Sequence, residues 1–239
     1  MTSCFVIRAD VCGIRLLHRF TCGTMQIMTD EYQPRIVPIL LFAAVVTFLV
    51  TVLRVVGESQ GWDSAWFNPA AGSAFNPLGI VWLVPLFGFI FGRRLAQTGS
   101  VPTFITGFFV PMFGFFSIIG MAMFLGSSFE GEEMKDAATY LFGAASLLSL
   151  LALFAWPRAF FTLLLYGISA RLPVMLVQYL DIQNGWQTHY GRTAPQMGHM
   201  GADERVWMLT QWQAGFWIPF TITLGCGFAA IGAAIGPRK

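Results

Sequence analysis

Apolar residues are grouped along the chain in six long blocks, which short polar segments separate. A membrane-spanning α-helix needs about 20 mostly apolar residues, because each residue adds about 1.5 Å to its length. The blocks predict helices over residues 36–56, 78–91, 103–125, 137–155, 159–180 and 206–235. The second block is short unless the preceding residues extend it, and the sixth is long enough to tilt. The pattern therefore predicts an all-α, polytopic integral membrane protein, a bundle of about six transmembrane helices.

Composition supports the same class. Apolar residues make up 56% of the chain and charged residues 11%, whereas about a quarter of the residues in soluble domains are charged. The chain contains 24 Phe and 8 Trp. Phe suits lipid-facing surfaces, and Trp suits the membrane interface. No basic run is long enough to indicate nucleic acid binding, so the lipid bilayer is the first partner that we expect.

Charged residues alternate between the two ends of the predicted helices. If the N-terminus is cytoplasmic, the inner segments hold nine of the 14 Lys and Arg residues, and the outer segments hold nine of the 12 Asp and Glu residues. Lys and Arg near helix ends favour the cytoplasmic side. An even number of helices is required, because Arg238 and Lys239 follow the last one. We therefore expect both termini in the cytoplasm. Chain size and the lack of eukaryotic sorting signals indicate the bacterial cytoplasmic membrane.

The segment 1–34 leaves two interpretations open. It carries several arginines and has no apolar stretch long enough for a signal-peptide core. It is either a short cytoplasmic arm or an extension of a chain whose natural start lies near Met25 or Met28. The four cysteines form no CxxC pair, which argues against a disulfide framework or a zinc ribbon.

Arg171 is the main candidate for a functional residue, because it lies past the middle of the fifth predicted helix. A charge at a helix centre costs about 2.5–3.5 kcal/mol on insertion scales. Glu58, Asp181, carbonyls freed by Pro173 or water in a cavity are the candidates to compensate it. Arg171 either contacts an anion or substrate in a cavity, or extends outward to the lipid headgroups. We expect Arg54, near the outer end of the first helix, to reach the headgroups.

Small residues four positions apart mark helix faces that can pack closely in lipid. These positions are Gly88 with Gly92, Gly225 with Ala229, and Gly232 with Gly236. Packing within the chain and a homodimer seam on the sixth helix both stay open. Four prolines are expected to kink helices by removing an amide donor. They are Pro85, Pro111, Pro173 and Pro219.

No metal or cofactor site is expected. His189 and His199 lie in the longest polar loop, 181–205, but they are ten residues apart with no helix to align them. The acidic segment 130–136 is expected to be a solvated connector. No His, Asp or Glu lies inside a predicted span, which argues against a haem with paired His ligands and against a proton relay.

Three functions are consistent with these features. The first is a small permease or a channel-like component, which kinked helices and Arg171 favour. The second is an accessory or structural subunit that joins a membrane partner or a homo-oligomer, which the small-residue faces favour. The third is an intramembrane enzyme that modifies lipid. It is less favoured, because no complete catalytic set is present and its polar residues would have to converge. Those residues are Ser169, Arg171, Gln178, Asp181 and His189.

Overall fold

Helices account for most of the part of the chain that the computed structural model describes, which comprises residues 33–70, 76, 78–97, 99, 101–195 and 199–236. The helices are α2 (Gln33–Ser59), α3 (Leu83–Ala96), α4 (Phe104–Ser128), α5 (Gly131–Ala155), α6 (Pro157–Asn184), α7 (Ala202–Gln211) and α8 (Ile218–Ile235). A 3-10 helix, η2 (Ile80–Trp82), precedes α3, and a π-helix, η4 (Trp212–Trp217), joins α7 to α8. These residues contain no β-strand, so the predicted all-α class is confirmed. The predicted arm 1–34 and its candidate start sites lie outside the described residues, apart from the first residues of α2.

Five segments are long and apolar enough to cross a membrane. They are α2, α4, α5, α6 and the continuous 34-residue segment made of α7, η4 and α8. The second predicted span corresponds to η2 and α3. α3 has 14 residues and is therefore about 21 Å long, less than the roughly 30 Å of a bilayer core. The chain is thus a multi-pass membrane bundle with five long helices and one short one.

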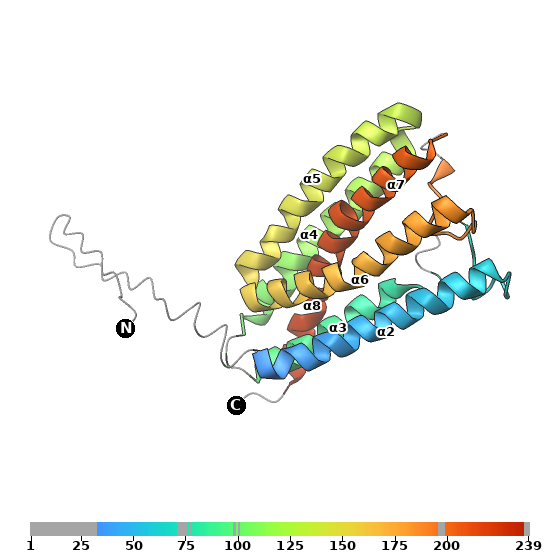
Figure 1. Ribbon diagram of the computed structural model, residues 1–239. Helices are drawn as coiled ribbons and strands as arrows, with labels where there is room; N and C mark the ends of the chain where they lie inside the picture. The colour runs from blue at the N-terminus through green and yellow to red at the C-terminus, as the bar shows by residue number, and fades with distance from the viewer. Residues whose placement is uncertain are drawn as a thin grey trace, which may run out of the picture.

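Successive spans run in opposite directions, with α7, η4 and α8 counted as one, so each end of the bundle has its own set of charges (Figure 1). One end holds the start of α2 and the end of α8, together with Arg93, Arg94 and Arg158. We call it the basic end. The other end holds the turns after α2, α4 and α6, and every Asp and Glu residue of the described chain lies there. We call it the acidic end.

Local sequence sets several helix ends. Thr103 precedes α4, and its hydroxyl accepts a hydrogen bond from the N–H of Thr106 at 3.2 Å, as an N-cap residue does. α6 begins with Pro157, whose missing N–H costs nothing in the first turn. It ends at Gly185, where φ is +65°, a left-handed conformation that glycine adopts without strain.

The α5 start is a correction to the sequence prediction. α5 begins at Gly131, so most of the acidic segment 130–136 is helical instead of a loop. Glu132 and Glu133 occupy its first turn, where carboxylates complement the helix dipole. One of the four prolines also differs from expectation: Pro85 lies in the first turn of α3, where little hydrogen bonding is lost.

α8 is the central helix, since it packs against α3, α4, α5 and α6. Its small residues face α3 at close range. A Cβ atom at Gly88 would lie 2.6 Å from the carbonyl oxygen of Gly225, and one at Gly92 would overlap that of Ala229. Gly232 lies against the backbone of Phe89 in the same way. α3 therefore covers the small-residue face of α8, and Gly236 lies beside Arg93 at its end.

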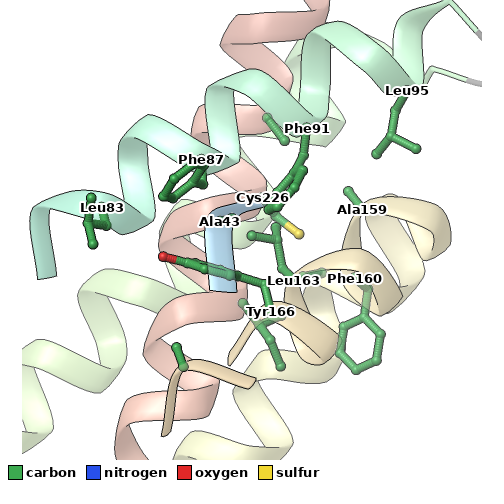
Figure 2. Packing of buried hydrophobic residues seen from close by; sticks show 14 of the residues in the cluster. Ala43, Leu83, Phe87, Phe91, Leu95, Ala159, Phe160, Leu163, Tyr166 and Cys226 are labelled. Carbon is green, nitrogen blue, oxygen red and sulfur yellow. The ribbon is translucent and has the colours of Figure 1, made fainter. Parts of the chain in front are cut away.

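A buried aromatic group links α6 to α3. The ring of Tyr166 lies against Phe87 and Phe91, with centroid distances of 5.6 and 5.8 Å (Figure 2). The Tyr166 hydroxyl lies 3.0 Å from that of Thr47 on α2. Outside this core the helices expose large apolar side chains, such as Phe113 at 66% and Phe154 at 82%. Such a surface suits lipid contact.

Candidate functional site

One face of α2 carries a stripe of buried polar residues. Thr47, Thr51, Arg54 and Glu58 are each no more than 8% exposed. Residues three and four apart are neighbours on a helix surface, so these four lie on one side of α2. The other sides carry exposed apolar residues. α2 packs against α6, and its polar stripe ends at the segment 188–191.

Glu58 joins α2 to the 188–191 segment. Its side chain is fully buried, and one oxygen accepts a hydrogen bond from Nε of Arg54 at 2.7 Å. The backbone N–H of His189 donates to the same carboxylate at 2.8 Å, and Nδ1 of His189 lies 2.8 Å from it. Sequence analysis placed Arg54 at the headgroups. It is instead 2% exposed, because Glu58 lies one turn further along the same helix face.

Asp181 of α6 holds the same segment from the other side. Its carboxylate accepts hydrogen bonds from the Thr188 hydroxyl at 2.5 Å and from the N–H of Gly191 at 2.8 Å. A Cβ atom at position 191 would lie 2.8 Å from a carboxylate oxygen, so a larger residue there would displace the Asp181 carboxylate. One buried carboxylate from each of two helices therefore fixes the 188–191 segment at the acidic end.

Tyr190 and His189 are the central residues of this segment. Tyr190 is 6% exposed, and its phenol hydrogen-bonds with Thr51. Burial raises the pKa of Tyr190 to about 12, so the phenol is neutral at physiological pH. Burial also lowers the pKa of His189, and this effect outweighs the opposing hydrogen bond to Glu58. His189 is therefore neutral near pH 7.

Arg171 of α6 is 4% exposed and has only neutral partners among the described residues. Its Nη1 donates a hydrogen bond to Oε1 of Gln213 at 3.3 Å, and its guanidinium carbon lies 4.8 Å from the ring centroid of Trp217. The phenols of Tyr166 and Tyr190 lie close enough to interact with its charge. Its buried Nε has no hydrogen-bond partner.

The structure pairs Arg171 with neither of the carboxylates that the sequence offered. Glu58 interacts with Arg54 and His189, and Asp181 interacts with the 188–191 segment. Arg171 does not extend to the headgroups either, because its side chain is enclosed between α6 and η4. The site is therefore a buried cation beside a buried, internally paired polar network.

The π-helix η4 supplies both contacts of Arg171. Gln213 and Trp217 lie within its six residues. Pro219 is the second residue of α8, directly after η4, and it lacks the N–H that would bond the carbonyl of Gly215 in a regular α-helix. A π-helical turn is wider than an α-helical one, and such turns are frequent at functional sites. The interruption therefore sits where the last transmembrane segment contacts Arg171.

The other candidate residues do not form a catalytic centre in the described part of the chain. Ser169 donates to the carbonyl of Tyr166 in its own helix at 2.9 Å. His199 is exposed. Among the residues described, no three His, Cys, Asp or Glu side chains are grouped to hold a metal ion. Lys135 bridges Glu132 and Glu204 at 2.7 and 2.5 Å, which ties α5 to α7.

Comparisons with protein-family models, with curated proteins and with solved structures give no match to this chain. The class of protein is therefore defined by the fold and the site alone. The chain is a multi-pass α-helical membrane protein that encloses a polar network and an arginine without an acidic partner among the described residues.

Sequence reasoning missed the polar stripe of α2. The missed signal is the spacing of Thr47, Thr51, Arg54 and Glu58, which recurs at four, three and four residues within an otherwise apolar block. Such spacing indicates a helix face turned away from lipid. Sequence analysis assigned Glu58 to a loop and treated Arg54 alone, and the stripe therefore stayed undetected.

Proposed function

We propose that this protein is a small permease, or the channel-like component of one, and that it binds an anionic solute at Arg171. The observation that carries the proposal is a buried cation whose contacts in the described chain, Gln213 and Trp217, are neutral. A charge at membrane depth costs about 2.5–3.5 kcal/mol on insertion scales, and ionisable residues at such depth often mark solute pathways. A bound anion would supply the countercharge.

The guanidinium edge that contains Nε favours a small carboxylate or phosphate ester. Nη1 is engaged by Gln213, and one face of the group lies near Trp217, whereas Nε is without a partner. An arginine edge donates two parallel hydrogen bonds to such groups. A single cation matches a singly charged solute best. The neutral phenol of Tyr190 lies near Arg171 and adds no countercharge.

The charges at the bundle ends support an orientation for this permease. Arg93, Arg94 and Arg158 lie at the basic end, and positive residues near helix ends favour the cytoplasmic side. We therefore place both termini in the cytoplasm of a bacterial cell and the 188–191 segment on the outer side of the cytoplasmic membrane. The solute would then reach Arg171 from outside past Tyr190.

The two other functions have less support. A subunit seam on the small residues of α8 would compete with α3, which already lies against Gly225 and Ala229. A lipid-modifying enzyme would need Ser169 and His189 together, but Ser169 bonds its own helix and His189 pairs with Glu58. A transport role uses the unpartnered Nε of Arg171, which neither alternative requires.

Arg171→Leu tests the proposal. The purified protein is reconstituted into liposomes, and binding and uptake are measured for a panel of short carboxylates and phosphate monoesters. We expect the wild type to bind at least one of these anions and Arg171→Leu to lose that binding while still inserting. The matched control is Arg192→Leu, which removes an exposed arginine from the connection between α6 and α7. Equal anion binding in wild type and Arg171→Leu would refute the role of Arg171.

A further inference from the structure

α6 buries two polar atoms that lack hydrogen-bond partners and are of opposite kinds. Only three such side-chain atoms occur among the described residues: Nε of Arg171, Oε1 of Gln178 and Nε of Arg205. Arg171 and Gln178 belong to α6, and each is 4% exposed. Nε is a donor and Oε1 is an acceptor. Buried polar groups are nearly always satisfied, so an unsatisfied pair on one helix requires an explanation.

The two atoms belong to one face of α6. Gln178 follows Arg171 by seven residues, which is almost two full turns and about 10 Å along the axis. Val174 lies between them on the same face and is 2% exposed. Side chains in helices lean toward the N-terminus, so both side chains lean the same way and their polar ends stay about two turns apart. The face therefore holds a buried donor and a buried acceptor on either side of the buried side chain of Val174.

The neighbouring polar groups do not satisfy these two atoms. Oε1 of Gln213 already accepts from Nη1 of Arg171. The carboxylate of Asp181 is bound to Thr188 and Gly191. An acceptor for Arg171 and a donor for Gln178 are thus both missing from the described residues, and one molecule that carries both would satisfy the whole face.

We infer that the solute carries a hydrogen-bond donor several bonds away from its anionic group, and that Gln178 binds this donor. The inference rests on the proposed anion site at Arg171 and adds the chemical class of the solute: a short carboxylate with a distal hydroxyl or ammonium group. Its carboxylate binds Arg171, its apolar chain lies along Val174, and its donor binds Oε1 of Gln178. Gln178 is then the residue that distinguishes such a solute from a simple fatty acid.

The test compares ω-hydroxycarboxylates of three to six carbons with isosteric acids in which a methyl group replaces the hydroxyl. Binding is measured by isothermal titration calorimetry on the full chain in lipid nanodiscs. We expect the wild type to bind the best hydroxy acid about tenfold more tightly than its isostere, a ratio that corresponds to about 1.4 kcal/mol and lies within the range for one hydrogen bond. Gln178→Leu should remove this preference and leave the isostere's affinity unchanged.

Two further variants keep the test decisive. Gln183→Leu is the matched control, because it removes an exposed glutamine of the same helix and should preserve the preference. Gln178→Met replaces Gln178→Leu if the latter fails to fold. Two outcomes would overturn this inference and leave the anion site standing. In the first, both acids bind in an Arg171-dependent way with equal affinity. In the second, the preference for the hydroxy acid survives both Gln178 variants. Binding of neither acid to the wild type would overturn the anion site and this inference with it.

Discussion

The buried carboxylate of Glu58 gives the most direct test of the polar network. Glu58→Gln keeps the side-chain shape and removes the charge. The wild-type carboxylate receives Nε of Arg54, the N–H of His189 and Nδ1 of His189, all within 2.8 Å. A glutamine has one acceptor oxygen, and its NH2 group cannot accept a hydrogen bond. At least one of the three groups must therefore lose its partner.

The expected cost follows from burial. Hydrogen bonds to charged groups contribute about 1.5–3 kcal/mol, and breaking a buried ion pair costs about 3–5 kcal/mol. We expect Glu58→Gln to lower the free energy of unfolding by about 2–4 kcal/mol, since the amide retains part of the network. Equilibrium unfolding in mixed detergent micelles measures this value. The charged Arg54 should keep the single amide oxygen, so the NH2 group faces His189, and the His189 amide, which loses its acceptor, should show faster hydrogen exchange.

Glu132→Gln is the matched control. Glu132 also pairs with a basic residue, Lys135, at 2.7 Å, but its side chain is 85% exposed. Exposed pairs contribute little because water screens them, so this variant should lose less than about 1 kcal/mol even with its part in the helix dipole. The reasoning is refuted if the two variants lose equal stability, or if Glu58→Gln leaves the His189 amide as protected as before.

Two further predictions concern pH and helix packing. Burial lowers the pKa of His189, so the unfolded chain, whose histidines titrate near pH 6.5, binds the proton more tightly than the native state. The melting temperature should therefore decrease as the pH is lowered through about 6.5, and His189→Gln should show a smaller decrease. Identical pH profiles of the melting temperature in the two proteins would contradict this. Gly92→Ala should destabilise the protein by about 1–3 kcal/mol, as overpacking does, because its Cβ would overlap the carbonyl oxygen of Ala229. Gly120→Ala, on an exposed face with no atom within 4 Å, is the control and should not destabilise; equal losses in a thermal unfolding assay would contradict the close approach of α3 and α8.

The class of fold was predictable because it depends on composition along the chain. Apolar blocks long enough to cross a bilayer can be satisfied only as helices, because lipid offers no hydrogen bonds to the backbone. The predicted α5 began too late for a related reason. Glu132, Glu133 and Lys135 are polar, so hydropathy excluded them, although carboxylates favour the first turn of a helix.

The sequence by itself determined that this chain is a helical membrane protein, and it singled out Arg171, because a charge inside an apolar block is costly wherever the block lies. Only the tertiary structure decided what surrounds that charge. Glu58 and Asp181 were both candidate partners, yet they bind the 188–191 segment, and Gln213 reaches Arg171 from a π-helix 42 positions away in the chain. Partner choice in a buried network depends on which side chains the helix packing brings within about 3 Å. Local sequence patterns do not encode that distance.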